Sequence, residues 1–207
     1  MVVAILADES AKDELMKKGF PEETEIVWAD SIASLTIIEA DAYFDLLFEY
    51  DRERILKIKR LLPQPVFVNS VIHICGDLGA GFIRINGWPT MIGRNVAEIA
   101  HSGNDNHIKN ILKQLGWLYS RSPDIPGMIT PRIVSMIVNE AWYALGENVS
   151  TREEIDTAMK LGTNYPYGPF EWGEKIGFGR IRSLLAELAK TDARYTVAPG
   201  LNELQWL

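Results

Sequence analysis

The side chains that most often bind metal ions, three histidines and one cysteine, are not arranged to do so in this sequence. His73, His101 and His107 have no regular spacing relative to carboxylates, and no cluster of ligands surrounds Cys75. A structural zinc site needs such ligands in closely spaced pairs. A lone cysteine also cannot form a disulfide within the chain. The sequence therefore predicts no metal centre, and any chemistry must come from other residues.

A polar stripe on one predicted helix is a candidate ligand-binding surface. The helix covers residues 130–145, because it opens with a threonine that can cap it and a proline suited to a first helical position. Arg132, Ser135 and Asn139 are spaced i, i+3, i+7 and so share one face. This face could line a cleft for an anionic or amide-rich ligand. Exposure of the three side chains to solvent would explain them equally well.

The elements of the first half alternate in type. Short apolar or β-branched runs predict strands, and the charged stretches between them predict helices. Strands alternating with helices are typical of a parallel sheet with crossover connections, which makes the first domain α/β. The predicted strands are residues 2–6, 25–29, 41–48, 65–68, 82–85, 88–92 and 117–119, and the helices are residues 10–18, 51–62 and 105–115.

After the proline-rich turn at residues 123–127 the pattern becomes helical throughout. The helix at 130–145 is apolar on nearly every side, which predicts burial. Two more helices are predicted at 151–160, with Ser150 and Glu153 as a capping box, and at 181–190. The fold class is therefore α/β plus all-α, with the first domain at residues 1–125 and the second at 126–207.

Composition limits the kinds of partner. The chain of 207 residues is 47% apolar and 24% charged, as expected of a globular protein. Its formal net charge of −7 disfavours nucleic acid and anionic membrane surfaces. The N-terminus carries only a short apolar stretch with no basic residues before it, which is unlike a signal peptide. A cytoplasmic location is the expectation.

One long motif in the helical half carries a family resemblance. Residues 154–171 read E-I-D-T-A-M-K-L-G-T-N-Y-P-Y-G-P-F-E, which closely resembles the pattern E-x-I-D-x-A-M-K-x-G-x-G-Y-P-x-G-P-F-E of the 3-hydroxyacyl-CoA dehydrogenase family. Residues 126–129 resemble the P-G-F-I that opens the same domain, and residues 40–49 and 68–70 are similar to segments of the first domain. Physically, Gly162 and Pro169 also suit two helices joined by a rigid turn, which needs no ligand.

The resemblance implies a small Rossmann-like domain followed by a helical domain like the C-terminal domain of 6-phosphogluconate dehydrogenase. It also implies NAD as cofactor, an acyl-CoA ligand in fatty-acid metabolism, and a homodimer through the helical domain. In the family, a histidine held by a glutamate takes the substrate's hydroxyl proton. Residues 96–99, V-A-E-I, resemble the segment that carries the glutamate, which is Glu98 here, and counting back places Asn86 at the histidine position. An ordinary surface or helix-capping role for Glu98 remains open.

The predicted site departs from the family in its cofactor loop, at the general base, and at two further positions, where Pro131 and Val71 replace an expected asparagine and serine. After the first strand the chain reads Ala7, Asp8, Glu9, Ser10, without the glycines that let backbone amides approach a pyrophosphate. Asp30 stands where the carboxylate that binds the cofactor's ribose would stand, although it could simply cap the following helix. At the position of the general base, Asn86 cannot accept a proton near neutral pH.

Two functions remain open at this point. The resemblance implies an active NAD-dependent oxidoreductase that acts on 3-hydroxyacyl thioesters. The departures favour a non-catalytic relative of these enzymes, a dimeric module that binds acyl-CoA or a protein partner. Arg132, Ser135 and Asn139 would then contact the ligand, for example the pantetheine arm of CoA.

Overall fold

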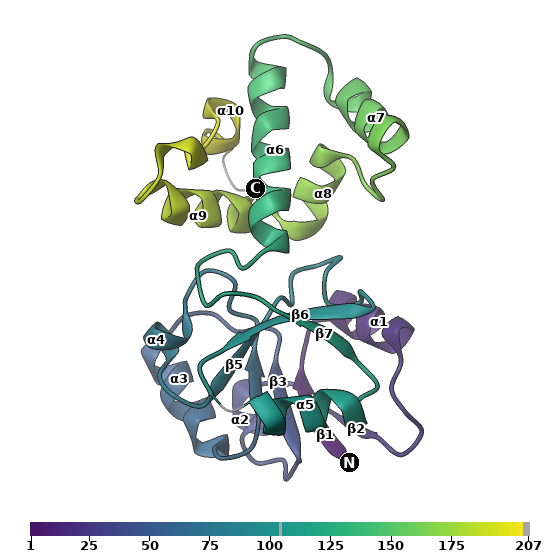
Figure 1. Cartoon of the computed structure of the whole chain (residues 1–207), viewed down its shortest axis with the longest axis vertical. Coiled ribbons are helices and arrows are strands. Elements are labelled where there is room, and N and C mark those ends of the chain that lie inside the picture. The colour runs from purple at the N-terminus through teal and green to yellow at the C-terminus, as the bar shows by residue number, and fades with distance from the viewer. Residues whose placement is uncertain (104, 205–207) are drawn as a thin grey trace. The chain divides into compact units, whose positions relative to one another are not determined.

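The computed structural model describes residues 1–103 and 105–204, and it divides into two compact units. The first unit, Met1–Met128, contains a seven-stranded sheet with helices, and the second, Ile129–Leu207, is all-helical (Figure 1). The predicted fold class, a Rossmann-like α/β domain followed by an all-α domain, is thereby confirmed. The predicted boundary between residues 125 and 126 lies three residues before this division, which follows Met128.

The sheet has the strand order β2-β1-β3-β4-β5-β6-β7. Neighbouring strands run parallel except β5 and β6, which are antiparallel. Because β2 and β3 lie on opposite sides of β1, the strand order reverses there, and the carboxyl ends of β1 and β3 form the edge where such folds bind ligands. The strands are β1 (Val2–Leu6), β2 (Glu25–Ala29), β3 (Ala42–Asp45), β4 (Val66–Val68), β5 (Phe82–Ile85), β6 (Val96–His101) and β7 (Leu118–Arg121).

Both faces of the sheet are covered by helices because alternate side chains of each strand point to opposite faces. In β1, Val3 and Ile5 belong to one buried cluster with residues of α1 (Glu9–Lys18) and α5 (Asp105–Gln114). Ala4 and Leu6 belong to a second cluster, which contains residues of the three remaining helices. Those helices are α2 (Ile32–Leu35), α3 (Arg52–Ile58), which continues into a 3-10 turn at Lys59–Leu61, and α4 (Cys75–Leu78).

The predicted strand at residues 88–92 is wrong, because this segment forms turns instead. The Met91 N–H donates to the Trp88 carbonyl at 2.9 Å, and Glu14 accepts hydrogen bonds from the Thr90 N–H at 2.6 Å and from the Gly93 N–H, just after the segment, at 3.1 Å. Thr90 also has a positive φ of 71°, which no strand residue adopts. The strand that follows β5 is β6, which was not predicted as a strand.

The helical unit is built around its longest helix, α6 (Thr130–Gly146) (Figure 1). It also contains α7 (Arg152–Thr163), α8 (Pro169–Ile176), α9 (Phe178–Ala189), a 3-10 turn at Ala193–Tyr195 and α10 (Pro199–Asn202). The predicted capping box at the start of α7 is shifted by one residue, since Thr151 accepts from the Glu154 amide at 3.3 Å. Among the described residues, no helix has both the length and the apolar character needed to cross a bilayer.

The 154–171 motif acts as a scaffold in this unit. Asp156 of α7 is buried, and its carboxylate accepts hydrogen bonds from the Phe170 N–H at 2.8 Å and the Glu171 N–H at 3.1 Å. These are amides of the first turn of α8, which have no partner inside the helix. A Cβ at Gly168 would collide with the Asp156 side chain, so the glycine is needed for close approach. The motif therefore joins two helices through one buried carboxylate.

Candidate functional site

The two residues predicted to occupy the family's catalytic positions, Asn86 and Glu98, lie side by side. Asn86 directly follows β5 and Glu98 lies on the antiparallel strand β6, where the Asn86 N–H donates to the Glu98 carbonyl at 2.9 Å. Their side chains also meet, with Asn86 Nδ2 3.4 Å from Glu98 Oε2. Both are buried, at 4% and 8% exposure. The alternative of a surface or helix-capping role for Glu98 is therefore wrong.

Asn86 is bonded within the protein through both atoms of its side-chain amide and offers no group that transfers a proton. The side-chain amide of Asn86 donates through Nδ2 and accepts through Oδ1, and neither atom titrates near neutral pH. Oδ1 lies 3.4 Å from the Trp88 N–H, and Nδ2 faces Glu98. In the described site, an amide stands where a general base would be needed.

Asn69 is a further site residue whose role the sequence did not reveal. It follows β4, and its side chain joins the ends of the strands on either side: Nδ2 donates to the Leu46 carbonyl at 3.1 Å, and Oδ1 accepts from the Gly87 N–H at 3.0 Å. A Cβ at Gly87 would come within 2.9 Å of the Asn69 side chain. Residues 68–70 resemble the family only weakly, and nothing local in their sequence indicates these long-range bonds.

The start of α1 does not fit a dinucleotide. Asp8 caps this helix, and its carboxylate accepts from the Ala11 N–H at 2.8 Å, so the side chain takes an amide that a pyrophosphate would need. Glu9 adds a second negative charge in the first turn, where it pairs with Lys12 at 2.7 Å. Two carboxylates repel a phosphate at close range. The residues present therefore do not fit NAD, in agreement with the missing glycines.

Asp30 lies at the end of β2 and is exposed. Its backbone N–H donates to Ser34 Oγ at 3.0 Å, whereas the side chain that caps α2 belongs to Ser31. The suggestion that Asp30 caps this helix is therefore wrong. Its predicted role in binding the ribose of a cofactor stays a prediction. The carboxylates at the start of α1, which do not fit a pyrophosphate, argue against this role.

Two residues of the polar stripe on α6, Ser135 and Asn139, face the interior of the helical unit. Ser135 is completely buried and Asn139 is 2% exposed, so the solvent-exposure alternative is wrong for both. Asn139 clamps the C-terminal segment, because Nδ2 donates to the Thr196 carbonyl at 2.9 Å and Oδ1 accepts from the Ala198 N–H at 2.8 Å. Arg132 donates to the Tyr195 hydroxyl at 3.1 Å. Ligand binding by the stripe stays a prediction, and Asn139 already has a structural role.

A separate apolar groove runs along the outer face of α6. Its volume is about 710 Å³, and Ile133 is 56% exposed in it, although the sequence had predicted that this helix would be buried on all sides. The groove therefore exposes apolar side chains of α6 to solvent. The groove is lined by Arg132, Ile133, Met136, Ile137, Glu140, Ala141, Ala144, Ile155, Met159, Pro169, Arg194 and Tyr195.

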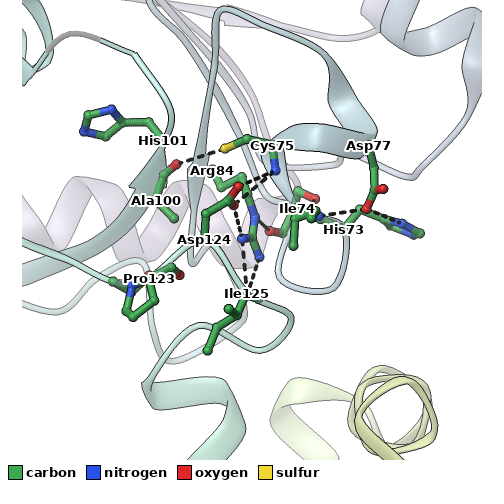
Figure 2. A network of polar contacts seen from close by, with 12 residues as sticks. His73, Ile74, Cys75, Asp77, Arg84, Ala100, His101, Pro123, Asp124 and Ile125 are labelled. Carbon is green, nitrogen blue, oxygen red and sulfur yellow. Dashed lines mark hydrogen bonds and ion pairs between the residues drawn. The ribbon is translucent and has the colours of Figure 1, made fainter. Parts of the chain in front are cut away.

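A buried polar network in the sheet unit surrounds Arg84 of β5 (Figure 2). Arg84 is fully buried, and its Nη1 lies 2.7 Å from Asp124 Oδ1. Asp124 also accepts from the Cys75 N–H, with both carboxylate oxygens at 3.1 Å. Arg84 and Cys75 together hold the pKa of Asp124 below its usual value, although partial burial opposes them. The described part of the chain contains no group of three or more metal-binding side chains.

The environment of Cys75 predicts an unreactive thiol. Burial, reinforced by the nearby Asp124 carboxylate, raises its pKa to about 12. Since only the thiolate attacks alkylating reagents, iodoacetamide at pH 8 should modify the native protein at least about a hundredfold more slowly than the urea-unfolded chain. Mass spectrometry over time would measure both rates. Native modification as fast as that of the unfolded chain would contradict the burial and the charge arrangement described here.

Comparisons with known proteins point to one family. Residues 127–204 match the family described as 3-hydroxyacyl-CoA dehydrogenase, C-terminal domain. The 3-hydroxyadipyl-CoA dehydrogenase of Escherichia coli (strain K12) is 49% identical over 77 residues, which cover 37% of this chain and 16% of that protein. A 3-hydroxybutyryl-CoA dehydrogenase of Bradyrhizobium diazoefficiens is 38% identical over 95 residues, which cover 45% of this chain and 32% of that protein.

Among solved structures, the (S)-3-hydroxybutyryl-CoA dehydrogenase of Ralstonia eutropha has a TM-score of 0.73 at 18% sequence identity, covering 98% of this chain and 92% of that chain. At this identity the likeness shows a shared fold. The sequence matches cover less than a third of the length of either curated relative. The family match therefore covers the helical unit, and the solved structure shows a shared fold.

Proposed function

We propose that this chain, whose residues 127–204 match the 3-hydroxyacyl-CoA dehydrogenase C-terminal domain, is a non-catalytic relative of these enzymes that acts in fatty-acid metabolism. In this proposal the protein is a dimeric module that binds acyl-CoA or a protein partner, and it does not carry out NAD-linked oxidation. The helical unit contains the 154–171 motif that resembles the family, and its buried Asp156 bonds to the Phe170 N–H. The departures from the family instead affect the cofactor loop and the position of the general base.

The observation that carries the proposal is the Asn86–Glu98 pair. The two side chains meet at 3.4 Å, so the positions assigned to the family's histidine and glutamate are neighbours in this fold, with an amide in place of the imidazole. General base catalysis needs a group that can accept a proton near neutral pH, which an amide cannot do. The Asp8 cap on α1 supports the same conclusion from the cofactor side, because it takes up an amide of the anion-binding helix terminus.

An active oxidoreductase is the second candidate, and the burial of Glu98 favours it. A carboxylate at 8% exposure beside a hydrogen-bond donor is an arrangement that enzymes use for proton transfer. In that case Glu98 would have to serve as the base in place of a histidine. Carboxylates are in general weaker bases than imidazole by about two pKa units, which lowers the expected rate by tens to hundreds-fold.

The dimeric part of the proposal rests on the groove beside α6. Ile133, Met136 and Ile137 present an apolar face there, and burying apolar surface is the main driving force of subunit association. A second copy of this chain, which would offer the same apolar face, is the occupant that we propose. A twofold pairing buries the same patch on both copies.

The decisive experiment measures oxidation of NADH by acetoacetyl-CoA. We expect no steady-state rate above background, and no change in the Glu98→Gln variant, because the base and the cofactor loop are both missing. The Asn86→His variant should not restore activity, since Asp8 and Glu9 still oppose NAD.

Calorimetry should find NAD binding no tighter than about millimolar, a value that corresponds to roughly −4 kcal/mol.

A clear wild-type rate that Glu98→Gln abolishes would instead make Glu98 the base and establish the second candidate.

A thermal-shift series with CoA and acetoacetyl-CoA tests the binding function independently of turnover. A ligand present at a hundred times its dissociation constant stabilises the native state by about 2.7 kcal/mol. A 3-hydroxybutyryl-CoA dehydrogenase assayed in parallel provides the positive control.

A further inference from the structure

Residues 122–127, called the linker below, follow β7 at the end of the sheet unit; they form no helix or strand but are tied down along their length. At its start, the Ser122 N–H donates to the Ile99 carbonyl of β6 at 2.8 Å. At its end, the Gly127 N–H donates to the Val71 carbonyl at 2.8 Å. Between these points Asp124 and the Ile125 carbonyl both contact Arg84. Segments without helix or strand are ordinarily exposed and mobile, whereas this one is held by hydrogen bonds at both ends and in the middle.

Arg84 holds two segments that are far apart in the sequence (Figure 2). Its Nε donates to the Ser70 carbonyl at 2.8 Å and its Nη2 to the Val71 carbonyl at 2.9 Å, which fixes the loop after β4. The other contacts of its guanidinium are with Asp124 at 2.7 Å and the Ile125 carbonyl at 3.2 and 3.3 Å. One fully buried cation therefore joins the loop after β4 to the linker.

The loop after β4 also borders the candidate site. Asn69 precedes it and bonds to the Gly87 N–H at 3.0 Å, next to Asn86. A buried charge that loses its partner is strongly destabilising, so the loop and the linker should respond together when Arg84 is disturbed. The Arg84 side chain therefore contacts both the linker and the loop that borders the candidate site.

We propose that Arg84 is a clasp that locks the linker onto the sheet unit and couples its mobility to the loop beside Asn86. When the clasp is intact, residues 122–127 behave as part of the sheet unit. When it is broken, the linker detaches and the loop loosens with it, while both units remain folded. The inference holds whether or not the protein is catalytic, because it depends only on contacts inside the sheet unit.

Limited trypsin digestion of the full chain tests the clasp. The bond after Arg121 lies at the start of the linker, and cleavage there needs local detachment of the chain on both sides. We expect the Arg84→Met and Asp124→Asn variants to be cut at this bond at least about tenfold faster than the wild type, because proteolysis follows the population of the opened state. Fragment masses identify the cleaved bond.

The Arg54→Met variant is the matched control. Arg54 also pairs with a completely buried carboxylate, that of Asp45, with Nη2 to Oδ1 at 2.6 Å, but it joins α3 to β3 and does not contact the linker. If the Arg54→Met variant were cut after Arg121 as fast as the Arg84→Met variant, general destabilisation would be responsible and the clasp would be overturned. Should Arg84→Met fail to fold, Asp124→Asn decides, since Asp124 is partly exposed and its replacement leaves the Arg84 side chain in place.

Hydrogen exchange measures the coupling directly. In the Asp124→Asn variant, the amides of Gly127 and Gly87 should both exchange at least about tenfold faster than in the wild type, although neither donates to Asp124. Faster exchange at Gly127 alone would limit the clasp to the linker and would disprove the coupling. Unchanged exchange at both amides would disprove the proposal as a whole.

Discussion

Replacing Asp156 by Ala is expected to destabilise the helical unit by about 3 kcal/mol, since hydrogen bonds to a charged group contribute about 1.5–3 kcal/mol each and are not fully additive. The substitution removes the acceptor of the Phe170 and Glu171 amides, at 2.8 and 3.1 Å. Both amides lie at the start of α8, and Phe170 is buried, so water cannot readily replace the carboxylate. Differential scanning calorimetry would record the lowered melting temperature.

Asp192→Ala provides the control for this effect. Asp192 also caps a helical turn of the same unit, where it accepts from the Arg194 N–H at 3.0 Å, but it is exposed. Loss of such a cap costs about 1 kcal/mol or less. Similar shifts of the melting temperature in the two variants would contradict the special role of the buried carboxylate and would leave the motif without its structural explanation.

The Asp156 contact shows which part of this fold the sequence could predict. Periodicity located the strands at residues 2–6 and 25–29 correctly, because local β-branched runs specify them. The motif predicted two helices joined by a turn but gave no hint that a side chain within α7 holds the start of α8. Contacts between distant residues are not encoded in local patterns. The wrong strand at 88–92 has the same origin, because Glu14, far away in sequence, accepts the hydrogen bond of the Thr90 N–H.

The candidate site was predictable only in part. Family spacing selected Asn86 and Glu98, and the antiparallel pairing of β5 with β6 brings them together. Asn69 and Arg84 were missed because their importance comes from burial and from partners in other segments. The stripe of Arg132, Ser135 and Asn139 was correctly placed on one helix face. Spacing alone could not tell whether that face met solvent, a ligand or, as in the structure, the C-terminal segment.

The difference between the two faces of α6 leads to the prediction with the largest effect on assembly. Val138 and Asn139 are buried within the unit, whereas Ile133 and Ile137 line the groove. The inward face is therefore needed for folding, and the outward face is available for a second copy of the chain. A substitution on the outward face should separate assembly from folding.

The Ile137→Asp variant should raise the dissociation constant of the proposed homodimer at least about a thousandfold, because an unpaired charge buried at an interface costs several kcal/mol and every 1.4 kcal/mol is tenfold. Sedimentation velocity at micromolar concentration would show a dimer for the wild type and a monomer for the variant, and circular dichroism would verify that the variant is folded. Ile37→Asp, at a position in the sheet unit that is 82% exposed, should stay dimeric. A monomeric wild type would refute the dimer but not the loss of catalysis, which rests on Asn86 and Asp8.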